Sequence, residues 1–494
     1  MRASGILLPI ASLPSKYGIG AFSNSAYQFI DFLREAGQKY WQILPLSPTS
    51  YGDSPYQSFS TFAGNPYFID LDELVKQGLL TEEECNSYDF GTDERDVDYG
   101  LIYESRFKIL KKAYLRSQIG KNTVFQEYLK ENDFWIRDYG LYMAIKEKFD
   151  GDSWIEWDAD IRLRTAAAVA RYEEELKAKI EFYQYLQFEF KNQWMALKQY
   201  ANENGVKIIG DIPIYVAFDS ADSWANPALF QFDEASRPIA VAGCPPDGFS
   251  ATGQLWGNPL YDWEYHKKTE YEWWVQRTRT SFRLYDVVRV DHFRGFDEYY
   301  SIPAANDTAE FGMWKQGPGY ELFAVLNREL GELDFIAEDL GYLTPSVIEL
   351  VEKTGYPGMK VLEFAFDSRE ESDYLPHNYT SNCIVYTGTH DNQTLRGWIK
   401  ELSEEDRNYA VEYMNLRTIC EDEFHWDFIK LAMQSVARTA IIPMQDYLGL
   451  DGEARINFPS TVGGNWTWRL LEEELTKELS RKIARVSRLY GRSK

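Results

Sequence analysis

Eight short runs of apolar and β-branched residues, separated by segments with helical periodicity, limit the folds open to this chain more than any other feature. The runs cover residues 5–14, 41–46, 206–216, 287–296, 334–340, 359–366, 383–389 and 439–444. Strands that alternate with helices favour a parallel sheet, and eight such units are typical of an α/β fold closed into a (β/α)8, or TIM, barrel. An open doubly wound sheet is the alternative, but its glycine-rich phosphate loops, GxGxxG and GxxxxGK, are absent from the sequence.

Helix signals between the runs support this alternation. Thr81 and Glu84 have the spacing of a capping box, in which two side chains satisfy backbone N–H groups at a helix start. Thr344 followed by Pro345 predicts another helix start, and Gly355 predicts the end of that helix. These signals place helices in the connections rather than in the apolar runs.

Two connections are too long to be simple loops. We expect a single catalytic barrel over residues 1–494, with a helical insertion subdomain at 70–180 after the second strand. A second insertion, at 218–285, separates the third strand from the fourth. It holds a Gly- and Pro-rich stretch with Phe249 and Trp256, which predicts a lid over an active-site cleft, although a cluster of ordinary turns is the alternative.

Charge and composition limit the partners. The formal net charge of −25 argues against nucleic acid and against an anionic membrane surface. No run approaches the roughly 20 apolar residues of a membrane helix, and the first residues do not have the pattern of a signal peptide. The four cysteines lie far apart without CxxC spacing, so we expect no disulfide, no zinc site and a cytoplasmic location. We expect no cofactor and no metal ion, since the spacing assembles no cage of converging oxygens.

Aromatic residues give a first hint of the ligand. The chain has 15 Trp and 34 Tyr, and aromatic rings with a polar edge suit flat, hydroxylated molecules such as sugars. The loop after the second run holds Tyr51 and Tyr56 among turn-forming residues. Loops that follow barrel strands build the sites of this fold, so we expect these tyrosines to contact a ligand; an ordinary surface loop is the alternative.

Residues 287–296 begin as a β-branched run typical of a buried strand and end in polar and charged residues. Side chains alternate across a strand, so Arg289 and Asp291 share one face while Val288 and Val290 share the other. A cation this close favours the ionised carboxylate, which a nucleophile needs. A buried ion pair with a structural role alone is the alternative. Asp211 lies in the middle of the third run, where an acid must be paired or functional.

Three acids follow three strands of the expected barrel. We expect Asp291 to end the fourth strand, Glu338 the fifth and Asp391 the seventh. The barrel would bring them to one rim, where mutual repulsion would be hard to justify by structure alone. Two carboxyl groups, one ionised and one protonated, are the equipment of a retaining glycosidase. Neither a serine nucleophile elbow nor an HExxH zinc site competes with this interpretation.

Longer motifs identify a family. The chain resembles the 4-α-glucanotransferases called amylomaltases or disproportionating enzymes, a branch of the α-amylase clan. The motifs are SGILLPIASLPSKYGIG, YGDSPYQSFSTFAGNP, GDIPIYVAFDS, PPDGFSATGQLWGNPLYDW, VRVDHFRGF, IAEDLG, THDNQT and RINFPSTVGGNWTWR. They extend over nearly the whole chain.

The resemblance implies a role for each matching residue. Asp291 would be the nucleophile with Arg289 beside it, Glu338 the general acid and then base, and Asp391 a stabiliser of the transition state. The residues that it places at the sugar are Tyr56, Asp211, Trp256, Arg289, His292, His390, Asn457 and Pro459. Tyr51 and Phe249 are further aromatic candidates for an acceptor subsite or a lid that lowers water access.

The resulting hypothesis is transfer of α-1,4-glucan segments to the 4-hydroxyl of an acceptor glucan or glucose through a covalent glucosyl-enzyme. Donors and acceptors would be maltooligosaccharides, amylose or glycogen-derived glucans. Transfer requires that sugar reach the intermediate before water does. An α-1,4-glucan hydrolase is therefore the nearest alternative, and a catalytically silent glucan-binding protein is the alternative from another class.

Overall fold

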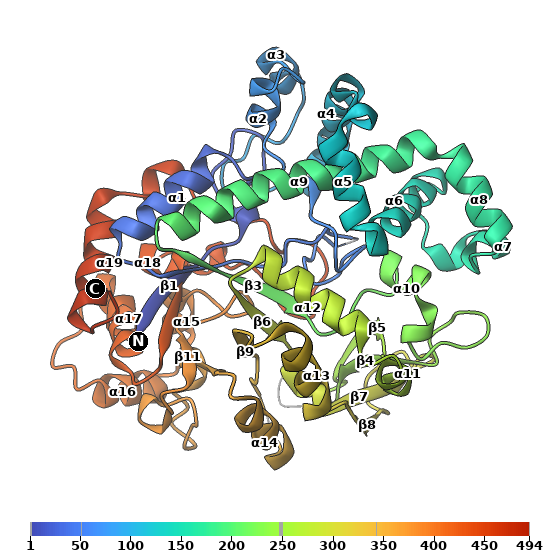
Figure 1. Ribbon diagram of the computed structural model, residues 1–494. Helices are drawn as coiled ribbons and strands as arrows, with labels where there is room; N and C mark the ends of the chain where they lie inside the picture. Colours follow the sequence, from blue (N-terminus) through green and yellow to red (C-terminus); the bar gives the residue numbers. More distant parts are fainter. Residues whose placement is uncertain (1, 51, 247–249, 342, 494) are drawn as a thin grey trace.

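Eight parallel strands form a nearly closed barrel at the centre of the molecule (Figure 1). The structure is a computed structural model that describes residues 2–50, 52–246, 250–341 and 343–493. The strand order is β10-β11-β12-β1-β2-β3-β6-β9. Between β9 and β10, the backbone N–H of Ala337 donates to the carbonyl of Pro357 over 3.0 Å. This hydrogen bond joins the two strands at the ends of that order. The expected (β/α)8 barrel is confirmed.

The barrel strands are β1 (Ala3–Leu7), β2 (Tyr40–Gln42), β3 (Lys207–Pro213), β6 (Val287–Asp291), β9 (Phe335–Ala337), β10 (Gly358–Val361), β11 (Cys383–Tyr386) and β12 (Thr439–Pro443). Each falls in or at the edge of one of the eight apolar runs, but most are shorter than the run. Residues 5–14 were expected as one strand, and this was wrong: the strand ends at Leu7 and a 3-10 turn follows at Ile10–Ser12. Pro9 explains the change, because it has no N–H with which to continue a ladder.

Helices cover the barrel from outside. The helices that precede β3 are α1 (Asn24–Glu35), α2 (Leu71–Lys76), α3 (Glu82–Asn86), α4 (Tyr99–Ser117), α5 (Thr123–Glu131), α6 (Asp133–Lys148), α7 (Ala159–Arg162), α8 (Ala166–Glu175) and α9 (Lys177–Glu203). Those that follow are α10 (Ala221–Ala225), α11 (Trp263–Lys268), α12 (Glu272–Leu284), α13 (Tyr320–Leu330), α14 (Pro345–Thr354), α15 (Leu395–Glu401), α16 (Glu404–Tyr413), α17 (Phe424–Gln434), α18 (Met444–Leu448) and α19 (Lys477–Leu489).

Both predicted helices form where their signals placed them. The hydrogen bonds of the first signal are present, and the second helix ends with the expected backbone conformation. Thr81 and Glu84 form the full capping box at the start of α3. The helix α14 starts at Pro345 and ends at Thr354, and Gly355 caps it with a φ of 72°, a left-handed conformation that glycine adopts at little cost. Thr344 occupies the cap position, but its hydroxyl contacts Ser346 Oγ at 3.0 Å instead of capping the backbone.

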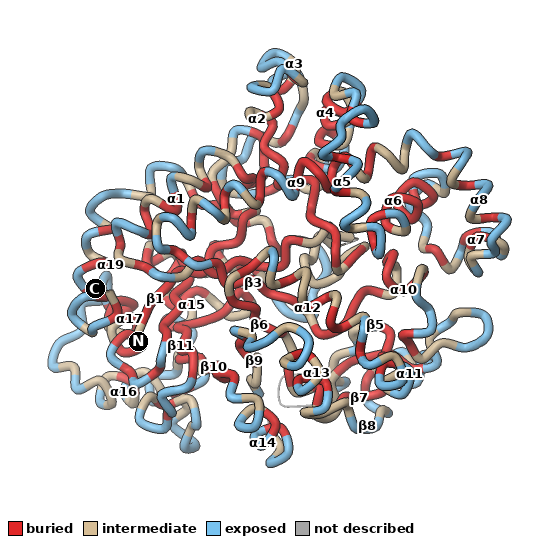
Figure 2. Tube along the Cα trace, viewed as in Figure 1, coloured by how far each residue is buried: buried red, intermediate tan, exposed pale blue. Residues whose placement is uncertain are grey.

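Strand alternation divides the apolar side chains into two layers. On β3, Ile209 points into the barrel and packs in a cluster with Val287, while Ile208 belongs to the larger core between strands and helices. This larger core continues beneath the surface helices, so the barrel strands are buried while outlying helices such as α3 and α7 are exposed (Figure 2).

The long connection between β2 and β3 contains helices α2 to α9 and extends to one side of the barrel (Figure 1). Trp135, Trp154 and Trp157, all on this connection, are buried. They build its interior.

A second, antiparallel sheet was not expected. Its order is β5-β4-β7-β8, from β4 (Ala240–Cys244), β5 (Gln254–Pro259), β7 (Glu298–Pro303) and β8 (Met313–Gln316). The two strands β4 and β5 lie in the segment whose Gly and Pro content predicted a lid, because short hairpin strands between turn-forming residues give only a weak periodic signal. None of the described helices is long and apolar enough to cross a membrane.

A tight contact on the outside of β3 can be tested. The position of a Cβ atom at Gly210 lies 2.1 Å from the Tyr285 ring. Gly210→Ala should therefore destabilise the fold by about 1–3 kcal/mol through overpacking, measured as a lower midpoint of urea denaturation. Gly100→Ala, at an exposed position in the first turn of α4, is the matched control and should leave the midpoint unchanged or slightly raised. Equal midpoints for both variants would contradict this packing.

Candidate active site

A buried arginine joins two strands at the end of the barrel where the predicted acids lie. Asp211 on β3 is directly opposite Arg289 on β6 in the parallel register. Arg289 Nη1 donates to Asp211 Oδ2 over 2.6 Å, and Nη2 donates to Asp291 Oδ1 over 2.9 Å. The alternation of residues 287–296 predicted the second of these contacts, and only the barrel creates the first.

The electrostatics of this cluster favour charge on Arg289. Burial opposes the charged guanidinium, but the carboxylates of Asp211 and Asp291 outweigh it and hold the pKa of Arg289 well above its ordinary value. The Asp211 side chain has no exposed surface, whereas the side chain of Asp291 is 32% exposed. Asp291 is thus the member of the cluster that a ligand can reach.

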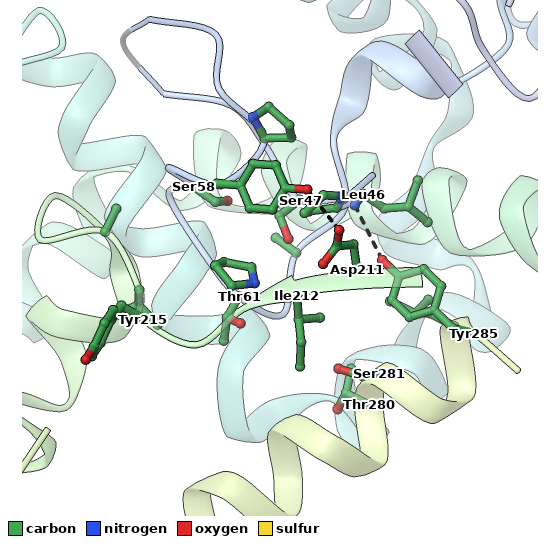
Figure 3. A pocket seen from close by; sticks show the side chains of 18 residues that line it. Leu46, Ser47, Ser58, Thr61, Asp211, Ile212, Tyr215, Thr280, Ser281 and Tyr285 are labelled. Atoms are coloured by element: carbon green, nitrogen blue, oxygen red, sulfur yellow. Dashed lines mark hydrogen bonds between the residues drawn. The ribbon is translucent and has the colours of Figure 1, made fainter. Parts of the chain in front are cut away.

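Tyr56 connects this cluster to a second one. Its hydroxyl donates to Asp211 Oδ2 over 2.9 Å and lies 3.4 Å from His390 Nδ1. The Tyr56 and His390 rings stack with their centroids 5.1 Å apart. Figure 3 shows Asp211 from the side of a small cavity of about 30 Å³ that lies beside it and extends toward Tyr285.

The second cluster surrounds Asp391. His390 Nε2 lies 3.3 Å from Asp391 Oδ2, and the amide of Asn457 donates to Asp391 Oδ1 over 2.6 Å. Burial disfavours the ionised carboxylate, but His390 and Asn457 outweigh it and hold the pKa of Asp391 well below its ordinary value. The same ion pair raises the pKa of His390 against the effect of burial. The carboxylate remains 45% exposed, so it is charged and accessible.

The surroundings of Glu338 favour its protonated form, whereas those of Asp391 favour the ionised carboxylate. It directly follows β9, which pairs with β6 through Val290 and Ala337, so it is one residue further along the ladder beside Asp291. Its carboxylate accepts the backbone N–H groups of His292 over 2.7 Å and of Leu340 over 3.0 Å. Burial and the nearby Asp291 nevertheless raise the pKa of Glu338 to about 7. It can therefore hold a proton near neutral pH.

His292 links Glu338 to the small sheet. Its backbone is left-handed, with a φ of 56°, and this turn aims its N–H at Glu338. The imidazole packs edge-on against Trp256 on β5, with centroids 4.8 Å apart. Burial and the charge of Arg294 lower the pKa of His292 to about 3, so the ring is neutral. Its buried Nε2 has no partner within the described part of the chain.

Asp446 fixes the loop that carries His390 and Asp391. This buried residue on α18 accepts the hydroxyl of Thr387 over 2.5 Å and the backbone N–H of Leu395 over 2.8 Å. One carboxyl group therefore ties together both ends of the loop. Burial raises the pKa of Asp446 to about 7.

Sequence reasoning missed Asp446, Arg455 and Trp466. Arg455 donates to the carbonyl of Asp391 over 2.6 Å, and Trp466 packs against both Tyr56 and His390. Asp446 could have been found, since it follows the eighth apolar run as the other acids follow theirs. Arg455 and Trp466 belong to a quoted motif, but nothing in their spacing showed what they contact.

The remaining predicted residues are less closely joined. Pro459, two residues after Asn457, is exposed. Tyr51 and Phe249 lie outside the described residues. In the described part of the chain, no group of three or more His, Cys, Asp or Glu residues is arranged to hold a metal ion.

A (β/α)8 barrel with three acids at the carboxyl ends of its strands, two in contrasting ionisation states, defines an enzyme of the glycoside-processing class. The family model described as 4-alpha-glucanotransferase, glycoside hydrolase family 77, matches residues 8–475. This chain belongs to that family of retaining glucan transferases.

Relatives support the assignment over the full length. The 4-alpha-glucanotransferase of Clostridium butyricum is 51% identical over 485 residues, which cover 98% of this chain and 99% of that protein. The one from Streptococcus pneumoniae is 52% identical over 494 residues, covering 99% of this chain and 97% of that protein.

Solved structures agree with the fold. An amylomaltase from Streptococcus agalactiae, determined in complex with acarbose, matches with a TM-score of 0.97 at 42% identity, covering 100% of both chains. An amylomaltase from Corynebacterium glutamicum matches with a TM-score of 0.78 at 18% identity, covering 100% of this chain and 75% of that one. The second likeness concerns the fold alone.

The raised pKa of Glu338 predicts how stability depends on pH. The folded protein keeps this proton up to about pH 7, whereas the unfolded chain releases it near the ordinary value of 4.5. Ionised Glu338 therefore lowers the free energy of unfolding, with no effect below pH 4.5 and the full effect above pH 7. Glu338→Gln removes this titration, so stability relative to wild type should increase by about 3 kcal/mol from pH 4.5 to 8.

Chemical denaturation at several pH values would measure this slope. The exposed Glu349→Gln on α14 is the matched control and should follow the wild-type curve. The absolute stability of Glu338→Gln is less informative, because the amide cannot accept both backbone N–H groups. A constant difference between Glu338→Gln and wild type across this pH range would contradict the assignment.

Proposed function

We propose that this chain moves α-1,4-glucan segments from a donor to the 4-hydroxyl of an acceptor glucan or glucose by double displacement through a covalent glucosyl-enzyme. The observation that carries the mechanism is the pair Asp291 and Glu338. They lie side by side on neighbouring strands, and parallel strands are about 4.8 Å apart. Adjacent positions on neighbouring strands allow the close approach, roughly 5–5.5 Å, that the two carboxyl groups of a retaining enzyme need.

In the first half of the reaction, Asp291 attacks the anomeric carbon while protonated Glu338 donates to the departing glycosidic oxygen. The C–O bond to the leaving fragment breaks, and an ester bond to Asp291 forms. Arg289 keeps one oxygen of Asp291 in place, which leaves the other for attack. The pKa of Glu338, raised to about 7, supports its role as the acid.

In the second half, ionised Glu338 takes the proton of the acceptor 4-hydroxyl, and the new oxygen displaces Asp291. The products are a glucan with a new α-1,4 bond and the free carboxylate. Asp391 would accept hydrogen bonds from sugar hydroxyls, and these strengthen as positive charge develops on the ring. The charged state of Asp391, held by His390 and Asn457, supports this role.

Sugar binding would use the residues that surround the three acids. Tyr56, Asp211, His292 and His390 would bind the donor ring, with the unpartnered Nε2 of His292 as one contact to a hydroxyl. Trp256 on β5 would form part of the lid expected in segment 218–285, where it packs on His292. Tyr51, Phe249, Asn457 and Pro459 remain predicted contacts. A cytoplasmic location also remains a prediction from the sequence.

The products formed from maltotriose test the function. Long incubation with pure protein should give glucose together with a ladder of longer maltooligosaccharides, separated by chromatography. Glucose and maltose alone would mean that water outcompetes the acceptor, and the chain would be a hydrolase. Unchanged maltotriose, with binding retained, would favour a silent glucan-binding protein.

A single substitution tests the mechanism. Asp291→Asn removes the nucleophile with little change of shape and should lower kcat by roughly 10⁴-fold or more, as expected when one member of a concerted set is lost. The matched control is Asp160→Asn on α7, where the carboxylate makes an exposed ion pair with Arg171. Near-wild-type turnover by Asp291→Asn would show that another residue is the nucleophile.

A further inference from the structure

We propose that a groove between α6, α10 and α12, separate from the strand-end site, binds a stretch of glucan. The groove has a volume of about 240 Å³, against about 30 Å³ for the cavity beside Asp211. It lies where the two long insertions of the barrel meet, to one side of the strands (Figure 1). Its size admits a sugar ring rather than single water molecules.

Aromatic rings form one wall of this groove. Phe62 packs edge-on against Phe134 at 5.4 Å and against Trp273 at 6.1 Å, and nearly parallel to Trp135 at 6.3 Å. Phe134 is 45% exposed, although its neighbours are largely covered. An exposed ring beside buried ones presents a flat apolar face, which suits the C–H face of a glucose unit.

Polar side chains also line the groove. Glu272 and Gln276 come from α12, and Asp222 from α10. Asp222 is buried and held in position by the backbone N–H of Thr61, which donates to its Oδ2 over 2.8 Å. Carboxylate and amide groups at fixed positions can bind pairs of neighbouring hydroxyls.

The charges of the groove argue against an anionic ligand. None of the described residues that line it is Lys or Arg, so an anion such as phosphate finds no partner. Asp138, one of its acids, is already paired with Arg164 Nη2 at 2.5 Å. A neutral polyhydroxylated chain is the ligand that matches a lining of aromatic rings and hydrogen-bond acceptors, and the family substrate is such a chain.

The groove shares a wall with the active-site region. In the segment 58–63, Ser58, Thr61 and Ala63 line the cavity beside Asp211, while Ser60 and Phe62 line the groove. This segment follows Tyr56 directly in the chain. A glucan held in the groove would thus be kept near the acids, which raises its effective concentration there.

The inference rests on the proposed glucan specificity and predicts a dependence on substrate length. A short glucan cannot occupy both places, so loss of the groove should leave kcat/KM for maltotriose within twofold of wild type. Long glucans should lose affinity. Phe134→Ala should weaken binding to glycogen about five- to tenfold, the value of one aromatic contact.

Affinity electrophoresis in gels containing glycogen would measure this, with Asp291→Asn in every protein to prevent turnover. The protein that carries only Asp291→Asn gives the reference affinity. Phe134→Ala and Gln276→Ala should migrate faster than the reference, and Phe134→Tyr, which keeps the ring, should not. The control is Leu489→Ala, an equally superficial change on α19 at the far side of the molecule (Figure 1).

Unchanged retention of Phe134→Ala and Gln276→Ala would overturn the proposal. If these variants kept their affinity for glycogen but lost binding to a polylysine peptide, the groove would bind a cationic ligand, which would also overturn the proposal. Failure of the wild-type chain to disproportionate maltotriose is a separate result, which would reject the proposed function before the groove is tested.

Discussion

The guanidinium of Arg289, buried between Asp211 and Asp291, is the interaction on which the site depends. Arg289 and Asp211 would each be a costly buried charge without the other, and removing one member of such a pair costs about 3–5 kcal/mol. Asp211 comes from β3 and Arg289 from β6, so the ion pair also requires these strands to be in register. Because Asp211 also accepts the Tyr56 hydroxyl, the loop after β2 is oriented by the same charge.

Three carboxyl groups in one site acquire different properties from their neighbours. Burial and the nearby Asp291 raise the pKa of Glu338 to about 7. In contrast, His390 and Asn457 hold Asp391 in its charged form. These differences require fixed geometry, and backbone groups supply much of it. The left-handed turn at His292 directs an N–H at Glu338, and Asp446 ties both ends of the loop that carries Asp391.

The long connections between barrel strands add residues to the site that the strands themselves do not supply. Barrel strands and the residues directly after them supply the acids, whereas Trp256 reaches His292 from a hairpin of the small sheet. The groove lined by Phe62 and Phe134 forms only because helices of both insertions meet beside the barrel. A glucan chain is much longer than a single active site, and a protein that handles it gains from contacts placed on such added segments.

The sequence by itself determined the barrel and the acids. Eight apolar runs alternating with capped helices have few other solutions, and an acid after a buried strand is a local signal, as for Asp291 and Glu338. The small sheet escaped prediction, since its short strands lie among turn-forming residues. The partners of Arg455, Trp466 and Asp446 were decided by tertiary structure alone. Local periodicity reports which face of a strand or helix is buried, but contacts between residues hundreds of positions apart depend on barrel closure and register, which no local pattern encodes.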